Sequence, residues 1–182
     1  MRVVVVGSSG SGKTTLARRL GAELGVAFVE LDAINWQAGW RDLNTHDPDE
    51  FVRRVEAATA GEAWVTDGNY GRVRPVLWAR ATHLVWLDYS RTVIMPRVIR
   101  RSFARALDGQ ELWPGTGNRE RIADWLSREH PIRWAWDTHR RRRARYEALL
   151  AGADCGHLNV RRLRHPREAD GLAASLKGGA AG

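Results

Sequence analysis

Eight consecutive residues near the start of the chain have the types and the spacing needed to bind phosphate. They are Gly7, Ser8, Ser9, Gly10, Ser11, Gly12, Lys13 and Thr14, and they fit G-x-x-x-x-G-K-[ST] at every defined position. Glycines let the backbone turn tightly and bring amide N–H groups close to phosphate oxygens. In such a loop the lysine reaches the β- and γ-phosphates and the final hydroxyl binds Mg²⁺. We expect Thr15 to lie near the α-phosphate.

The stretches on either side of this motif are those that a phosphate-binding loop requires. Residues 1–6 form a β-branched run typical of a buried strand, and residues 15–24 carry apolar side chains at helical spacing. A helix that begins at the loop adds its N-terminal N–H groups and its dipole to the site. A plain Gly/Ser-rich turn would not need this context. The sequence therefore predicts a P-loop (Walker A motif) that binds a nucleoside triphosphate with Mg²⁺.

Four further strands follow the first, separated by stretches with helical patterns. We expect the strands at residues 1–6, 26–31, 63–66, 83–87 and 156–160. This alternation predicts an α/β domain around an open parallel sheet, whose ligands bind beyond the carboxyl ends of the strands. At or just past such an end lie Gly7, Asp32, Asp67, Asp88 and Arg161. We expect these residues on one face of the sheet, with Arg161 among the nucleotide-binding residues.

Aspartates at the ends of apolar strands are candidates for the second metal ligand of a P-loop enzyme. Asp67 and Asp88 both have this pattern, and we favour Asp67 because Gly68 behind it frees the backbone near the phosphates. Asp32 could contact Mg²⁺ or accept the proton of an attacking hydroxyl. Aspartate is also well suited to turns and helix caps, which is the alternative at each position.

Arginines flank an irregular segment in the second half of the chain. A helix that carries Arg97 and Arg101 is predicted from residue 90, or from a later residue because Pro96 would distort it beyond its first turn. A short helix is expected at 119–128, and another helix from residue 131 carries Arg140 in an arginine run. Phosphoryl transfer needs cations against the charge on the transferred group. These arginines predict a lid at about 106–132, although a solvated helix face is the alternative.

Two tryptophans, Trp36 and Trp40, lie in a predicted loop that follows the second strand. Aromatic side chains beyond a strand end suit stacking on a planar substrate. Ordinary packing is the alternative reading of both residues.

The composition fits a single soluble domain. The chain has 182 residues and a net charge of +8, which suits anionic partners such as nucleotides or nucleic acid. Its one cysteine excludes an internal disulfide, and neither a signal-peptide layout nor a membrane-spanning apolar run is present. We expect a cytoplasmic protein with one domain at 1–176 and a disordered tail at 177–182. The oligomeric state stays open.

Together these residues resemble the topology-modulation family, which are P-loop proteins related to adenylate kinase. The resemblance is carried by Gly7 to Thr14, Leu31-Asp32-Ala33 with Trp36 and Gly39-Trp40, Trp64 to Tyr70, Leu87-Asp88, Arg97 with Arg100-Arg101, and Trp134-Ala135-Trp136. It implies a three-layer α/β/α P-loop NTPase fold like that of nucleoside and shikimate kinases. The sheet order would be 2-3-1-4-5, with a helical lid insertion and with ATP and Mg²⁺ as cofactors.

The same resemblance implies roles for individual residues. Asp67 takes the metal position beside Thr14, and Asp32 faces an acceptor pocket that we extend to Gly68, Asn69 and Tyr70. Arginines at 97, 100 and 101 and one near 140 fall where such kinases place lid cations. Adenylate kinases continue D-G-F-P-R after the third strand, whereas this chain reads D-G-N-Y-G-R. The usual arginine for a nucleotide acceptor is therefore displaced or missing, which argues against AMP.

Three functional hypotheses follow. The first is an ATP-dependent phosphotransferase that passes the γ-phosphoryl group of Mg·ATP to a nucleotide or small-molecule acceptor. The second is a nucleotide-switched, nucleic-acid-associated regulator with weak ATPase activity, which the net charge of +8 supports but no recognisable nucleic-acid-binding module does. The third is a kinase of a non-nucleotide metabolite, as in shikimate- or gluconate-type relatives of the fold. No membrane partner is expected.

Overall fold

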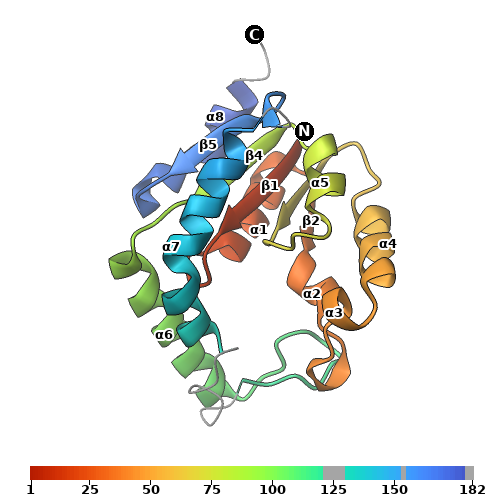
Figure 1. Ribbon diagram of the computed structural model, residues 1–182, viewed down its shortest axis with the longest axis vertical. Helices are drawn as coiled ribbons and strands as arrows, with labels where there is room; N and C mark the ends of the chain where they lie inside the picture. The colour runs from red at the N-terminus through yellow and green to blue at the C-terminus, as the bar shows by residue number, and fades with distance from the viewer. Residues whose placement is uncertain (121–129, 153–154, 179–182) are drawn as a thin grey trace.

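Five parallel strands form one sheet in the order β2-β3-β1-β4-β5 (Figure 1). The computed structural model describes residues 1–120, 130–152 and 155–178. The strands are β1 (Arg2–Gly7), β2 (Ala27–Glu30), β3 (Trp64–Asp67), β4 (His83–Leu87) and β5 (Asn159–Leu163). The predicted α/β class and strand order are confirmed.

Helices cover both faces of this sheet. They are α1 (Lys13–Leu24), α2 (Leu31–Asn35), α3 (Leu43–His46), α4 (Pro48–Ala58), α5 (Arg74–Arg80), α6 (Arg91–Asp108), α7 (Pro131–Leu150) and α8 (Leu172–Gly178), with 3-10 turns η1 (Ala38–Trp40) and η4 (Pro166–Ala169). Side chains of β1 alternate between the faces. Val4 and Val6 pack in a core with residues of α4, α5 and α7, whereas Val3 and Val5 pack with residues of α1, α6 and α8. The result is a three-layer α/β/α domain.

Local sequence signals fix two of the helix ends. Asp47 caps α4 by accepting a hydrogen bond from the Glu50 N–H at 3.3 Å, and Pro48 occupies the first helical position. Gly25 ends α1 with a φ of 71°, a conformation that favours glycine. These ends fix where the chain enters and leaves the sheet.

Three predicted boundaries are wrong. The last strand lies three residues later than expected, so Arg161 is inside β5, opposite Val85, and not beyond its end. Helix α6 begins at Arg91, which confirms the start near residue 90 and not a later one, and Pro96 lies in its interior because Ile94 and Val98 are buried against the sheet. The pattern at 166–176 predicts a single helix, but these residues form η4 followed by α8. Residues 177–178 of the expected tail belong to α8, and 179–182 lie outside the described residues.

The segment between α6 and α7 is only partly described. Residues 109–120 run along the edge of the molecule next to α2 and α3 (Figure 1). Most of the helix expected at 119–128 lies outside the described residues, as does the part of the expected lid at 121–129. No described helix is long and apolar enough to cross a membrane.

Candidate active site

The P-loop connects β1 to α1. Gly10 and Gly12 have φ angles of 82° and 88°, which an L side chain would strain. The Ser11 N–H donates to the Ser8 carbonyl at 3.1 Å and closes the turn. A Cβ at Gly10 would lie 2.8 Å from the Cβ of Val98, so the loop is pressed against α6. This arrangement leaves the first N–H groups of α1 at the mouth of the loop.

Two oxygen-bearing side chains meet beside the loop. The Thr14 hydroxyl donates to Oδ2 of Asp67, whose side chain is 1% exposed. The other oxygen of Asp67, Oδ1, is buried and has no hydrogen-bond partner among the described residues. Burial raises the pKa of Asp67 to about 6, although the nearby Lys13 acts in the opposite direction.

These contacts fit a magnesium ion bound together with a nucleotide. Mg²⁺ prefers oxygen ligands and is held by one or two protein groups plus phosphates and water. The unpartnered oxygen of Asp67 and the adjoining Thr14 hydroxyl supply such groups. In the described part of the chain no cluster of three or more His, Cys, Asp or Glu side chains could hold a metal by itself. The site thus needs the phosphates to complete it.

A cavity of about 790 Å³ opens over the P-loop. It is lined by Gly10 to Thr15, by Arg97, Arg101 and Arg105 of α6, and by Tyr89, Pro166 and Asp170. Gly7, Ser8 and Ser9 lead into this loop from β1. Arg97 lies over the Tyr89 ring, 5.8 Å from its centroid. Of the predicted loop residues, Gly10 to Thr15 share one cavity with Arg97 and Arg101, and Arg161 is not part of its lining.

Two half-buried arginines, Arg101 of α6 and Arg142 of α7, lie close enough to Asp32 for its charge to act on them. Burial lowers the pKa of Arg101 and of Arg142, and the negative charge of Asp32 raises both. The Nε of Arg101 is buried without a hydrogen-bond partner among the described residues. Arg140, the residue predicted from the arginine run, is exposed. Within that run Arg142 is half-buried, and the role of Arg140 stays a prediction.

Asp32 begins the face opposite the P-loop. It lies in the first turn of α2, just past β2, and accepts a hydrogen bond from the Tyr70 hydroxyl at 2.7 Å. Burial raises the pKa of Tyr70, and the Asp32 charge raises it further, so this hydroxyl keeps its proton. Gly68, with a φ of 132°, passes so close to Leu31 that a Cβ would clash at 2.9 Å. The D-G-N-Y stretch thus brings Tyr70 to Asp32.

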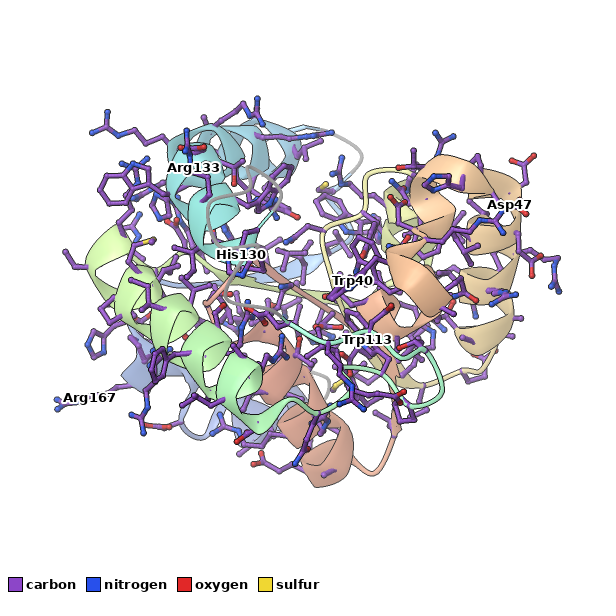
Figure 2. The ribbon with its side chains drawn as sticks, turned by 90° about the horizontal axis from the view of Figure 1, so that it is seen from below. Trp40, Asp47, Trp113, His130, Arg133 and Arg167 are labelled. Atoms are coloured by element: carbon purple, nitrogen blue, oxygen red, sulfur yellow. The ribbon has the colours of Figure 1, made fainter. Side chains whose placement is uncertain are left out.

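Trp36 and Trp40 contact each other and a third tryptophan, Trp113 from the segment after α6. Trp36 stacks on Trp113 with 6.3 Å between ring centroids, and Trp40 meets Trp113 edge-on at 6.1 Å. Figure 2 shows Trp40 and Trp113 next to each other. Asn118 joins the same segments: it accepts from the Trp40 N–H and donates to the Gln37 carbonyl, each at 2.9 Å. Stacking on a substrate stays a prediction for both loop tryptophans.

Asn69 has neighbours that the sequence did not indicate. Its side-chain oxygen accepts hydrogen bonds from the Gly7 N–H and from the Tyr146 hydroxyl, and its side-chain nitrogen donates to the Gly7 carbonyl. The substrate role expected of Asn69 stays a prediction, but its observed contacts are with the P-loop and α7.

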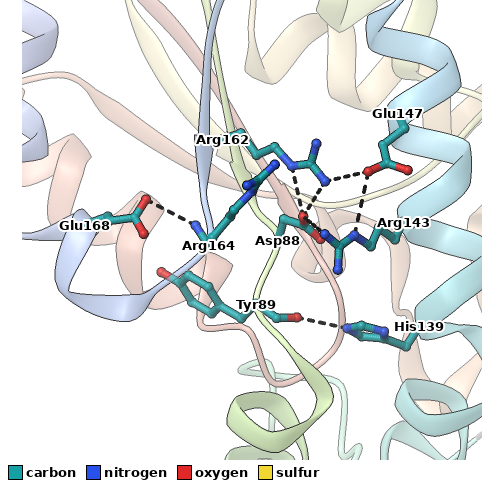
Figure 3. A network of polar contacts seen from close by, with 8 residues as sticks. All are labelled: Asp88, Tyr89, His139, Arg143, Glu147, Arg162, Arg164 and Glu168. Atoms are coloured by element: carbon teal, nitrogen blue, oxygen red, sulfur yellow. Dashed lines mark hydrogen bonds and ion pairs between the residues drawn. The ribbon is translucent and has the colours of Figure 1, made fainter.

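Asp88, the other candidate metal ligand, is engaged elsewhere. It forms ion pairs with Arg162 at 2.6 Å and with Arg143 at 3.3 Å, and Glu147 contacts Arg162 (Figure 3). Its neighbour Tyr89 offers a backbone carbonyl to His139 at 2.9 Å. These contacts tie α7 to β4 and β5, which supports the choice of Asp67 over Asp88 as the metal ligand.

Sequence reasoning missed three residues at this site, and one of them left a signal. Arg142 shares the buried face of α7 with Ala135, Thr138 and Tyr146, which are spaced three or four residues apart. That helical phase singles out Arg142 within the arginine run. No comparable pattern marks Trp113 or Asn118, since both lie in an irregular segment.

Several known proteins are similar to this chain in sequence. Residues 3–112 match the family described as AAA domain. A shikimate kinase of Synechococcus elongatus is 28% identical over 114 residues, which cover 53% of this chain and 55% of that protein. A shikimate kinase of Mycobacterium ulcerans is 40% identical over 67 residues, covering 35% of this chain and 36% of that protein. The chain spans about half the length of the first curated relatives it matches.

Solved structures share the fold. A shikimate kinase from Aquifex aeolicus aligns with a TM-score of 0.57 and 15% identity, covering 100% of this chain and 99% of that one. A gluconokinase from Sinorhizobium meliloti aligns with a TM-score of 0.51 and 17% identity, covering 98% and 94%. The predicted resemblance to nucleoside- and shikimate-kinase-like P-loop NTPases is confirmed. Because the family match covers more than half of the chain, including the P-loop and Asp67, the chain belongs to the AAA domain family.

Proposed function

We propose that the protein is an ATP-dependent kinase that phosphorylates a small, anionic metabolite. The observation that carries the proposal is that Asp32 lies near both the P-loop side chains and two half-buried arginines. Thr14 and Asp67 adjoin the P-loop, and the charge of Asp32 acts on Asp67 and on Arg101 and Arg142. A phosphate donor and an oxygen acceptor would meet between them.

Each group then has a chemical task. Lys13, Arg97 and Arg101 balance the charge that develops on the transferred phosphoryl group. Thr14 and Asp67 hold Mg²⁺, which neutralises phosphate charge when it is bound. Asp32, oriented by Tyr70, accepts the proton of the attacking hydroxyl. Gly68, Asn69 and Tyr70 border the acceptor side.

The residues on the acceptor side indicate the chemical class of the acceptor. Arg101 and Arg142 are guanidinium groups with little access to water, and such groups favour carboxylate or phosphate. Asp32 favours a hydroxyl. The printed names of the relatives, shikimate kinase and gluconokinase, are consistent with a hydroxylated carboxylate. The single cysteine and the absence of a membrane-spanning helix in the described residues are compatible with action in the cytoplasm.

The lid is also part of this proposal. Residues 109–120 contact the loop at 36–40 through Trp113 and Asn118, and Gln110 to Leu112 of the same segment line the cavity over the P-loop. Closure of this segment over the P-loop cavity would exclude water and so favour transfer over hydrolysis.

The test is a screen for acceptor-stimulated ADP release. Purified protein with Mg·ATP is offered nucleoside monophosphates, nucleosides, hydroxy acids and sugar acids, and ADP is measured by a coupled assay. A hydroxylated carboxylate or phosphate should raise ADP release at least tenfold over the rate without acceptor. Lys13→Ala should abolish this turnover, and Lys177→Ala, a substitution of the exposed lysine in α8, should leave it unchanged. Steep salt-dependent DNA binding without acceptor stimulation would instead favour a nucleic-acid-associated regulator.

A further inference from the structure

Asn69 continues the sheet at the point where its backbone pairing stops. The ladder between β1 and β3 reaches Val5 and Asp67, and the Gly68 N–H donates to the Val5 carbonyl at 3.2 Å. The next residue of β1 with groups facing β3 is Gly7. Its N–H donates to Oδ1 of Asn69 at 3.2 Å, and Nδ2 of Asn69 donates to its carbonyl at 2.6 Å. A side-chain amide carries the same donor and acceptor as a peptide unit, so it replaces a missing strand residue here.

A third hydrogen bond connects this amide to α7. The Tyr146 hydroxyl donates to Oδ1 of Asn69 at 2.7 Å. Tyr146 is 3% exposed and lies against Trp86, with 5.7 Å between the ring centroids. Its position is therefore set by the core and not by solvent. It lies one helical turn after Arg142, on the same face of α7.

The chain thus places one side chain between the first residue of the P-loop and the helix that carries Arg142. We propose that Asn69 is a positioning residue, which holds the P-loop and α7 at the separation that phosphoryl transfer requires. This inference rests on the proposed function and deepens it. Misplacing reacting groups by about 1 Å can cost 10²-fold in rate, so a link of this kind matters for turnover even though it touches no reacting atom.

Two substitutions separate the two ends of the link. Asn69→Asp removes the donor to the Gly7 carbonyl and places a negative charge beside that carbonyl, so the link between residue 69 and the P-loop is lost. Tyr146→Phe keeps the ring and both hydrogen bonds between Asn69 and Gly7, so it removes the hydrogen bond between Asn69 and α7. Thr138→Val is the matched control, because it removes another buried hydroxyl of α7, whose hydrogen bond among the described residues is to the Trp134 carbonyl within the helix. Thermal unfolding confirms that each variant is folded.

Two readouts need no acceptor. Calorimetric titration with a non-hydrolysable ATP analogue and Mg²⁺ should show at least tenfold weaker binding for Asn69→Asp, and affinities within twofold of the parent protein for Tyr146→Phe and Thr138→Val. Hydrogen exchange should show that the analogue slows exchange in α7 of the parent and of Thr138→Val. Tyr146→Phe should lose this protection while it still binds the analogue.

Kinetics complete the test where an acceptor is found. Tyr146→Phe should lower kcat about tenfold and leave KM for ATP within twofold. Wild-type affinity in Asn69→Asp, or undiminished protection of α7 in Tyr146→Phe, would overturn the inference. Failure to find any acceptor would contradict the proposed function. The calorimetric titration and the hydrogen exchange would still test whether Asn69 links the P-loop to α7.

Discussion

The buried carboxylate of Asp67 gives the site its pH dependence. Its pKa is raised to about 6, above the usual 3.8, chiefly by burial. The folded state therefore binds a proton more tightly than the unfolded chain does. Between pH 3.8 and about 6 the contribution of Asp67 to stability falls as pH rises, and above that range it stays low. Ionised Asp67 is the form that a metal ligand requires, so the fold gives up stability at neutral pH for this site.

Replacing Asp67 by asparagine should expose that cost. Without nucleotide or metal, the stability of Asp67→Asn relative to the parent should increase by about 1 kcal/mol between pH 5 and pH 7.5. Urea unfolding at the two pH values measures the change, and Asp49→Asn, at an exposed position of α4, is the control. An equal difference at both pH values would show that Asp67 titrates normally.

The arginine run on α7 offers a second comparison at the scale of single residues. Arg142→Gln should lower acceptor-stimulated turnover at least 100-fold, because it removes a half-buried cation from the space around Asp32. Arg140→Gln, two residues away on the exposed face, should stay within twofold of the parent. Steady-state ADP release measures the turnover of both variants. Equal effects of the two substitutions would show that Arg142 has no special role at the site.

At the scale of elements, the segment 109–120 is held on the loop at 36–40 by a small set of contacts. Asn118→Ala removes both hydrogen bonds of that side chain. We expect it to weaken the attachment by about 1–2 kcal/mol, which corresponds to roughly five- to thirtyfold faster local opening. Hydrogen exchange at residues 112–118 checks this, with Asn44→Ala on α3 as the control. Unchanged exchange would show that the three tryptophans alone hold the segment.

The ion-pair network of Asp88 belongs to the same scale, since it joins three elements. Asp88→Asn would leave Arg162 and Arg143 without their shared partner. Because both arginines are partly exposed, the loss of folding free energy should be about 1–2 kcal/mol, below that of a fully buried pair. Urea unfolding measures it. Affinity for Mg·ATP should remain within twofold, and a large loss of metal-dependent binding would restore Asp88 as a metal ligand.

At the scale of the whole molecule, the α/β class and the sheet could be predicted because the segments that form them have strong local sequence patterns. The P-loop motif, the apolar strands and the cap at Asp47 each have a local physical cause, and the sheet order follows from the resemblance. What it missed depended on distant partners. Arg162 looks like a loop residue, but in β5 it lies 4.2 Å from the Trp86 ring centroid and pairs with Asp88. The sequence likewise contained no sign that the Asn69 side chain would bond Gly7 and Tyr146.

The site itself was predictable in its donor half and less so in its acceptor half. Lys13, Thr14 and Asp67 follow from a motif and a strand end. The acceptor side gathers Asp32, Tyr70 and Arg142 from α2, the segment after β3, and α7, and only folding brings these together. The identity of the acceptor therefore has to come from experiment.

One measurement tests the central claim most directly. The protein is incubated with ATP labelled in the γ-phosphate, Mg²⁺ and a mixture of hydroxylated carboxylates and phosphates, and the labelled products are separated. Phosphoryl transfer predicts label on one acceptor, lost in Lys13→Ala and retained in Lys177→Ala. Label found only in inorganic phosphate, at a rate that no acceptor changes, would contradict the account.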